Sequence, residues 1–330
     1  MDDPLLSALA AARQELQSLP AGGNIGIAVS GGSDSTALLH LALEHLRGRL
    51  QAATIDHGLR PESADESAQV AENCQTLDLK HTIVKLAGLE GGPNLQARAR
   101  NARYDALTNW ARQRGLSTVL LGHTMDDQAE TVLMRLARGS GASGLAGMEA
   151  ATERHGIRWV RPLLGVRRAA LRDWLTAQGV PWIDDPSNDD LQFGRIKARK
   201  ALESLCDLGI SVEGLATTAN VLRSQAQVLD QAADSLLAQA NLPAPQGTVC
   251  FDRQALARAP QDTALRVLAT VLCDIGGNPY RPRHRSLAPL YDRICSAELF
   301  RASLAGCLID TKRNAAQVHI EPEPAASATR

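Results

Sequence analysis

The sequence has 330 residues, 44% of them hydrophobic and 22% charged, which is typical of a globular protein with room for two domains. No apolar run approaches the length of a membrane span, and the acidic start Met1-Asp2-Asp3 is unlike a signal peptide. The six cysteines lie far apart without a CxxC pair, which argues against a zinc site or a disulfide framework. We therefore expect a cytoplasmic protein with no membrane partner.

The net charge of −1 hides an uneven distribution. Residues 1–93 carry 6 basic and 12 acidic side chains, whereas residues 94–200 carry 17 basic and 11 acidic ones. Thirty of the 35 basic residues are arginine, the side chain suited to bidentate contacts with phosphate. An arginine-biased genome explains much of that ratio but not the clustering, so the middle third is the predicted nucleic-acid face.

Predicted strands and helices alternate through the first 200 residues. After a helix over 4–19, strands are predicted at 25–29, 51–56, 81–86, 117–121 and, as a strand or hairpin, 154–164. Helices are predicted at 37–46, 61–79, 94–114, 126–138 and 167–178. This alternation predicts an α/β fold with a doubly wound parallel sheet, in which ligands bind at the C-terminal ends of the strands.

The rest of the chain is predicted to form a smaller unit. We expect residues 1–205 to be a first, catalytic domain, and residues 206–320 to be a helical connector followed by a small C-terminal α/β domain. Residues 321–330 are rich in Ala, Pro and Glu, which predicts a disordered tail.

The most informative stretch is Ser30-Gly31-Gly32-Ser33-Asp34-Ser35, between the first predicted strand and the helix that follows. Two glycines let a ligand approach the backbone, and free N–H groups before a helix form an anion site. The stretch is not a Walker loop, because no lysine precedes the final hydroxyl. These six residues therefore predict a phosphate site; the alternative is a plain turn in which Asp34 or Ser35 caps the helix.

Asp34 places a carboxylate inside this phosphate loop. A carboxylate repels phosphate unless a cation bridges them, so Asp34 predicts Mg²⁺. Three further acids, Asp126, Asp127 and Glu130, share one face of the helix predicted at 126–138. Opposite Asp34, they suit a metal clamp on a triphosphate; the alternative is a helix start with solvated acids.

Other polar residues follow the predicted strands. Asp56 and His57 end the second strand and are candidate nucleotide contacts, and His123, after the fourth, is a candidate general base or orienting residue. Arg100 and Arg103 share a face of the helix at 94–114, and Arg103 is a candidate for an ATP phosphate. Because the ends of parallel strands meet at one edge, these residues should converge with the phosphate loop.

Residues 30–35 resemble the PP-loop of the N-type ATP pyrophosphatases, which cleave ATP to AMP and pyrophosphate. Further motifs follow in the order seen in tRNA(Ile)-lysidine synthetases, and the likeness covers about residues 20–200. The motifs are DHGLR at 56–60, ARNARY at 99–104, GHTMDDQAETVLMRLARGSG at 122–141, GLAGM at 144–148, RPLL at 161–164 and DPSN at 185–188. The Arg-Asn pair that usually follows DPSN is incomplete here: Arg195 and Arg199 align, but the Asn is absent.

The resemblance implies a two-step reaction. ATP would adenylate the C2 oxygen of the wobble cytidine in a CAU-anticodon tRNA(Ile), and the amine of free L-lysine would then displace AMP to leave lysidine. ATP and Mg²⁺ are the implied cofactors, and the implied catalytic residues are Asp34, Asp127, Glu130 and His123, with Asp34 and Asp127 holding the metal. The implied nucleotide-binding residues are Ser30, Gly31, Gly32, Ser33, Asp34, Ser35, Asp56, His57 and Arg103.

The partners predicted on this basis are the tRNA and lysine. Arg195 and Arg199, with Arg281 and Arg283 of the second domain, are the expected tRNA-binding residues. Asp127 and Glu130 are also candidates for binding the lysine, in competition with the metal role. A monomer and a homodimer both remain open.

Three other functions compete with this interpretation. A tRNA thiolase of the same superfamily would need paired cysteines, which are absent as a CxxC motif. An NAD-synthetase-like enzyme would not need the basic middle third. A degenerate nucleotide-binding adaptor would not need intact Asp34, Asp127 and Glu130.

Overall fold

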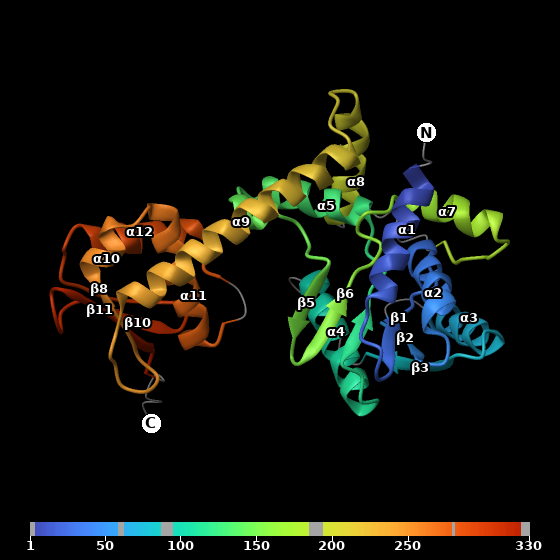
Figure 1. Cartoon of the computed structure of the whole chain (residues 1–330), viewed down its shortest axis with the longest axis horizontal. Coiled ribbons are helices and arrows are strands. Elements are labelled where there is room, and N and C mark those ends of the chain that lie inside the picture. Colours follow the sequence, from blue (N-terminus) through green and yellow to red (C-terminus); the bar gives the residue numbers. More distant parts are fainter. Residues whose placement is uncertain (1–3, 59–62, 87–94, 185–193, 279–280, 325–330) are drawn as a thin grey trace. The chain divides into compact units, whose positions relative to one another are not determined.

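The computed structural model describes residues 4–58, 63–86, 95–184, 194–278 and 281–324. The chain divides into two compact units, residues 1–140 with 144–220 and residues 141–143 with 221–330. Each unit has its own sheet, shown in Figure 1. The N-terminal unit contains every element that carries the predicted phosphate site.

Six strands form the sheet of the N-terminal unit, in the order β3-β2-β1-β4-β6-β5. They are β1 (Ile25–Ala28), β2 (Leu50–Asp56), β3 (Lys80–Lys85), β4 (Thr118–Leu120), β5 (Ala151–Arg154) and β6 (Ile157–Val160). All neighbours are parallel except β5, which pairs antiparallel with β6 as an edge hairpin. The predicted parallel sheet is confirmed.

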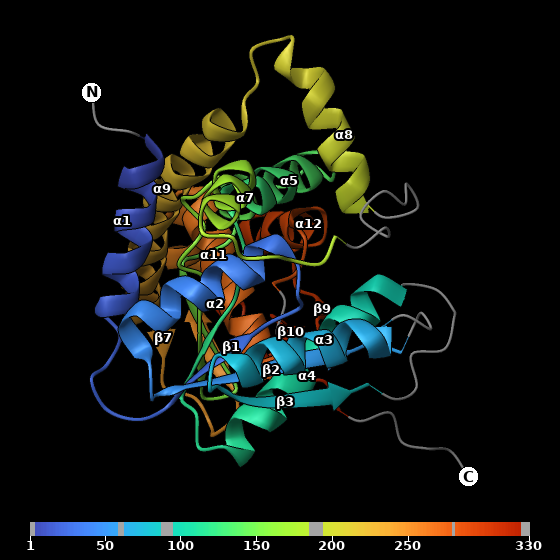
Figure 2. The same cartoon turned by 90° about the vertical axis from the view of Figure 1, so that its right-hand side faces the viewer.

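Helices cover both faces of this sheet. The helices that begin in the N-terminal unit are α1 (Pro4–Gln17), α2 (Ser33–Leu46), α3 (Ser63–Thr76), α4 (Leu95–Gln113), α5 (Met125–Leu136), α7 (Arg168–Ala177), α8 (Gly194–Cys206) and α9 (Val212–Ala240). A short helix, α6 (Ala142–Leu145), follows α5. Figure 2 shows α2 and α4 on opposite sides of strands β1 to β3, as a doubly wound fold requires.

The alternation of side chains along β1 explains this layering. Ile25 and Ile27 pack into a core that includes residues of α1, α2, α3 and α7, whereas the opposite face of the strand meets Trp110 of α4. A Cβ at Gly26 would lie 2.8 Å from the Trp110 ring, so the glycine lets the indole pack directly on the strand backbone. Burial on both faces explains why this strand is almost wholly apolar.

The C-terminal unit has an antiparallel sheet in the order β7-β8-β11-β10-β9. Its elements are β7 (Asn241–Leu242), β8 (Val249–Asp252), α10 (Arg253–Arg258), α11 (Gln261–Gly276), α12 (His284–Cys295), β9 (Arg301–Leu304), β10 (Cys307–Asp310) and β11 (Gln317–Pro322). Phe251, Leu268, Leu272, Ile309 and Ile320 are among its fully buried side chains. A connector helix followed by a small α/β unit is what the sequence predicted.

The structure corrects two sequence-based boundaries. Glu321 and Pro322 belong to β11, and Glu321 pairs with Arg313 at 2.5 Å, so the tail predicted from residue 321 begins too early. The last two residues of the strand were missed because Pro and Glu have a low strand propensity, which here is outweighed by pairing with β10. The second correction concerns Ser33–Ser35, predicted as loop, which form the first turn of α2. Within the described ranges, none of the helices is long and apolar enough to cross a membrane.

Candidate active site

The phosphate loop leaves β1 and turns sharply at Gly31. Its φ of +87° lies in the left-handed region that favours glycine. The Gly31 carbonyl accepts hydrogen bonds from the Ile183 amide (2.9 Å) and the Thr36 hydroxyl (3.1 Å). A Cβ on Gly31 would lie 2.7 Å from the Ile183 side chain, so the segment that follows α7 packs directly against the turn.

The first turn of α2 completes the loop. Gly32 is the N-cap residue, and the Ser35 hydroxyl lies 3.0 Å from the Gly32 carbonyl and 3.1 Å from the Ser30 amide, bonding both. Ser33 donates to Asp34 at 3.2 Å. Ser33 and Ser35 thus belong to the first turn of the helix. The positive end of the α2 dipole therefore faces the predicted phosphate site.

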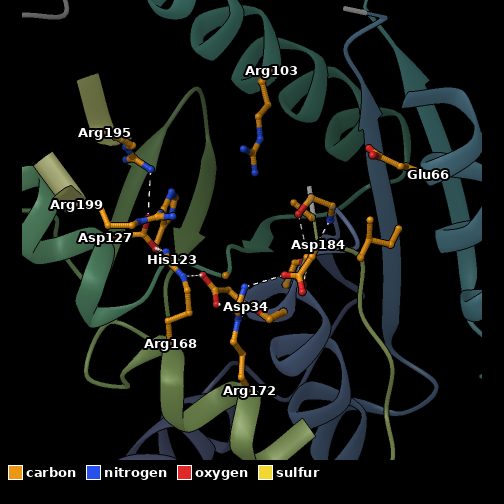
Figure 3. Close-up of a pocket in the computed structure, with 17 residues that line it drawn as sticks. Asp34, Glu66, Arg103, His123, Asp127, Arg168, Arg172, Asp184, Arg195 and Arg199 are labelled. Carbon is orange, nitrogen blue, oxygen red and sulfur yellow. Dashed lines mark hydrogen bonds and ion pairs between the residues drawn. The ribbon is translucent and has the colours of Figure 1, made fainter. Parts of the chain in front are cut away.

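A pocket of about 550 Å³ lies at the C-terminal ends of β1 and β4, where the strand order changes direction (Figure 3). This volume is in the range of small-ligand sites. Ten of the predicted residues line it: Ser30, Gly32, Ser33, Asp34, Ser35, Arg103, His123, Asp127, Arg195 and Arg199. The convergence predicted from the parallel sheet is therefore present in the structure.

Of the residues predicted for catalysis or nucleotide binding, four lie outside the lining of this pocket: Gly31, Glu130, Asp56 and His57. Glu130 is 1% exposed and lies one helical turn beyond Asp127. Asp56 accepts hydrogen bonds from the Gly58 amide (2.9 Å) and Ser63 (2.8 Å), so its carboxylate stabilises the turn after β2. The neighbouring His57 is half-buried, and its Nδ1 has no partner among the described residues.

Arg168, the first residue of α7, joins the acidic residues of the pocket. Its Nε donates to Asp34 at 2.8 Å, and its two terminal nitrogens lie 3.4 Å from Asp127 and 3.7 Å from Glu130. Figure 3 shows the side chain reaching into the space between Asp34 and Asp127. One guanidinium thus faces three carboxylates from two helices.

Two arginines of α8 approach the same acids. Arg195 lies 3.3 Å from Asp127, and Arg199 donates to Glu130 at 3.0 Å. Both were predicted as tRNA-binding residues, and the structure places them in the pocket. Their role toward tRNA stays a prediction.

Asp126 does not line the pocket and does not contact the Arg168 side chain as Asp127 and Glu130 do. It accepts a hydrogen bond from the Arg168 backbone N–H at 2.7 Å and pairs with the Arg167 side chain at 3.3 Å. The Met125 amide donates to the Val166 carbonyl at 2.9 Å. Asp126 therefore ties the start of α7 to the start of α5. Adjacent residues of a helix do not face the same way, so Asp126 points away from the side on which Asp127 lies.

The protonation behaviour of the acids differs. Burial raises the pKa of Asp34 and of Glu130, against the opposing effect of Arg168 and, for Glu130, of Arg199. Burial also opposes ionisation of Asp127, but Arg168, Arg195 and the Thr124 amide lower the pKa of that carboxyl below its usual value. Asp127 is thus the most firmly ionised of the three.

His123 is held as a neutral imidazole. Burial, reinforced by nearby arginines and opposed by Asp127, lowers its pKa to about 3. Its buried Nδ1 has no hydrogen-bond partner among the described residues. The ring is therefore available as a neutral donor or acceptor toward a ligand.

The carboxylates of Asp34 and Asp127 could bind Mg²⁺ if phosphate oxygens of a bound nucleotide supplied further ligands. In the described part of the chain, no group of three His, Cys, Asp or Glu residues could hold a metal ion by itself. Mg²⁺ is commonly held by one or two carboxylates together with substrate phosphates, and Asp34 and Asp127 supply that number. The second oxygen of Glu130 is buried without a hydrogen-bond partner in the described residues, so acceptor capacity remains.

Sequence reasoning missed Arg168, Arg172, Asp184 and Glu66, all of which line the pocket. Arg172 lies 3.4 Å from Ser33 and 2.8 Å from Asp184, so it links the phosphate loop to the segment after α7. One signal was available. Arginines at the start of a helix are unfavourable against its dipole, and α7 has no acid in its first turn, which indicates acidic partners elsewhere.

A twin-glycine turn at the switch point of a parallel sheet, with an acid in the following helical turn and arginines around it, defines a PP-loop protein. A family model described as "PP-loop domain" matches residues 7–205. A solved U34-tRNA thiolase from Methanococcus maripaludis is similar in fold, with a TM-score of 0.55, 16% identity, and coverage of 67% of this chain and 80% of that one.

The curated relatives are more specific. The chain is 44% identical over 290 residues to the tRNA(Ile)-lysidine synthase of Ruegeria pomeroyi, covering 86% of this chain and 68% of that protein. It is 38% identical over 317 residues to that of Methylobacterium nodulans, covering 92% and 91%. The chain belongs to the tRNA(Ile)-lysidine synthase family. The predicted family and the ATP-dependent ligase class are confirmed.

Proposed function

We propose that this chain uses ATP to join free L-lysine to C2 of the wobble cytidine in a CAU-anticodon tRNA(Ile), giving lysidine, AMP and pyrophosphate. The observation that carries the proposal is 38% identity across 92% of this chain and 91% of a tRNA(Ile)-lysidine synthase. The pocket supports it, because phosphate-binding groups and carboxylates meet in one space.

In the first step, the C2 oxygen of cytidine attacks the α-phosphorus of ATP, and the bond to the departing pyrophosphate breaks. Negative charge grows on the phosphate oxygens. The loop amides, the N-terminus of α2 and Arg103 are placed to stabilise this charge. Mg²⁺ held by Asp34 and Asp127 would neutralise further charge on the triphosphate.

In the second step, the lysine amine attacks C2, and AMP leaves with the former C2 oxygen. The amine must be neutral to attack, so the ammonium has to give a proton to one of the nearby acids. Asp127 and Glu130 can hold the ammonium before this loss. The neutral His123 is suited to orient the nucleophile or the base edge by a hydrogen bond.

The tRNA contacts are assigned to arginines in both units. In the C-terminal unit Arg281 and Arg283 are exposed near the start of α12, although Arg281 also lies 3.5 Å from Asp230. In the N-terminal unit Arg195 and Arg199 would meet the part of the tRNA that enters the pocket. Arginine suits both roles because it binds phosphate bidentately.

The test is a lysine-transfer assay with purified protein, ATP, Mg²⁺ and labelled lysine. One arm contains CAU-anticodon tRNA(Ile), and the matched arm contains the methionine tRNA with the same anticodon. Label in the isoleucine tRNA alone is the expected result. Pyrophosphate release without any tRNA would instead indicate a small-molecule synthetase.

A second measurement tests the C-terminal arginines. Changing both Arg281→Gln and Arg283→Gln should raise the KM for tRNA without changing the KM for ATP. Arg258→Gln, an exposed arginine on α10, is the matched control and should leave both values unchanged. An unchanged KM for tRNA in the double variant would remove these arginines from the proposal.

A further inference from the structure

Arg168 lines the pocket and also contacts three carboxylates, which points to more than a structural role. Its side chain is 19% exposed and lines the pocket, yet it contacts the carboxylates of Asp34, Asp127 and Glu130. Asp34 and Asp127 are the proposed metal ligands. The guanidinium therefore lies where these acids would meet a cation brought by the nucleotide.

The backbone of Arg168 is anchored by short hydrogen bonds, whereas two of the three carboxylate contacts of its side chain are long. Asp126 accepts the Arg168 N–H at 2.7 Å, and the Val166 carbonyl accepts the Met125 N–H at 2.9 Å, so the helix start is anchored on α5. By contrast, only the bond to Asp34 has a short distance, 2.8 Å, and the contacts to Asp127 and Glu130 are 3.4 and 3.7 Å. A side chain on a fixed base, with two long contacts, can change partners without moving the helix.

The charge balance gives the direction of that change. Three carboxylates face three guanidinium groups, those of Arg168, Arg195 and Arg199, so the cluster is close to neutral without a metal. A divalent cation on Asp34 and Asp127 would leave an excess positive charge unless a guanidinium took a new anionic partner. Among the described residues only Arg168 and Ser33 bond the Asp34 carboxylate, so Arg168 is the group that has to yield it.

We propose that Arg168 is a two-position cation: it holds the carboxylates of Asp34, Asp127 and Glu130 in the empty protein and transfers to the phosphates of ATP when nucleotide and metal bind. In the first position it weakens the binding of metal to the acids in the absence of nucleotide. In the second it adds to the charge that stabilises the leaving pyrophosphate. The inference rests on the proposed function for the identity of the nucleotide only.

The experiment measures metal binding without any reaction. Mn²⁺ is titrated at pH 8 into nucleotide-free protein and followed by electron paramagnetic resonance. Arg168→Met should bind Mn²⁺ about tenfold more tightly than the wild type, because a competing cation has been removed. Adding Asp34→Asn to this variant should abolish the gain. Arg158→Met, an exposed arginine of β6, is the matched control and should bind like the wild type.

A second readout tests the other position. Arg168→Met should bind Mg²⁺–ATP about tenfold more weakly while binding adenosine unchanged, since adenosine lacks phosphates. Arg168→Lys, which keeps the charge but cannot span three carboxylates, should fall between the two in both assays and guards against a folding defect. Equal Mn²⁺ affinity in Arg168→Met and wild type, or unchanged Mg²⁺–ATP affinity, would overturn the proposal. Failure of lysine transfer with these binding results intact would reject the proposed function alone.

Discussion

Two arginines, one from each unit, contact different kinds of partner. In the N-terminal unit Arg168 contacts the side-chain carboxylates of Asp34, Asp127 and Glu130. In the C-terminal unit Arg253, which is 4% exposed, donates to backbone carbonyls instead, those of Arg293, Ile294, Glu298 and Ala315 at 2.7–3.3 Å. Carboxylates that face a pocket can exchange a guanidinium for a ligand, whereas backbone carbonyls around a buried arginine cannot. The same residue type is therefore part of a site in one unit and of the scaffold in the other.

The largest expected effect is on catalysis, from Asp34→Asn. The change removes the charge that would hold Mg²⁺ and the shortest contact of Arg168, so ATP-dependent AMP formation should fall by about 10³-fold. Binding of tRNA, measured by filter retention, should be nearly unchanged. Asp234→Asn, an exposed acid on α9, is the control and should keep full turnover. Wild-type turnover in Asp34→Asn would remove this residue from the mechanism.

Arg253→Met is expected to lower the stability of the protein and to leave ATP binding unchanged. It leaves several buried carbonyls without a donor, so the free energy of unfolding should fall by about 3 kcal/mol, measured in urea. The KM for ATP should stay the same, because the residue belongs to the C-terminal unit. Arg285→Met removes an exposed arginine of α12 and should cost less than about 0.5 kcal/mol. A similar cost in both variants would contradict the scaffold role of Arg253.

Contacts between residues close in the chain could be predicted from the sequence, whereas contacts between distant residues could not. The phosphate loop is local: a strand, two glycines, polar residues and a helix stand next to each other in the chain, and the parallel alternation places it beside His123 and Asp127. The partner of Asp34 is not local, since Arg168 lies 134 residues further on. Such a pairing depends on how α7 docks on α5, which the hydrophobic pattern of α7 does not specify.

Arginine roles were harder to predict than acid roles for the same reason. Arg195 and Arg199 could be found in the chain, but their pairing with Asp127 and Glu130 depends on the docking of α8. The residues between Asp184 and Gly194, including the DPSN motif, lie outside the described residues. The start of α2 at Ser33 was predicted too late, because serines give weak boundary signals compared with the apolar residues that follow, whereas the start of α7 was predicted to within one residue.

Within the phosphate loop, the two glycines are predicted to differ. Gly31→Ala forces a side chain into a left-handed turn and against Ile183 at 2.7 Å and Val70 at 3.0 Å, so it should cost about 2 kcal/mol of stability. Gly32 has φ −68°, and its nearest neighbours to a new Cβ are 3.8 Å away. Gly32→Ala should therefore cost less than about 0.5 kcal/mol. Thermal unfolding of the two variants decides the point, and equal losses would mean that the Ile183 contact does not constrain the loop.

A smaller effect than at Gly31 is expected at Asp310, a buried acid of the scaffold that can be compared with the acids of the pocket. It is fully buried, pairs with Arg301 at 2.7 Å and Arg313 at 3.2 Å, and accepts the Lys312 amide at 2.8 Å. Although burial opposes ionisation, the Lys312 amide and the two arginines lower the pKa of Asp310 below its ordinary 3.8. Because both arginines are largely exposed, water screens the pairs, and Asp310→Asn should cost only about 1 kcal/mol at pH 7.

The sign of its pH dependence follows from the lowered pKa. The folded state releases the Asp310 proton more readily than the unfolded state, so the contribution is complete above pH 3.8 and is lost as the pH falls through the lower folded value. The difference in unfolding free energy between wild type and Asp310→Asn should accordingly be constant from pH 7 to pH 5 and shrink below pH 3.8. Urea unfolding across this range measures it, with Asp234→Asn as an exposed control that shows no such narrowing. A difference that grows on acidification would mean that burial, not the arginines, dominates at Asp310, and that this acid behaves like Asp34 and Glu130.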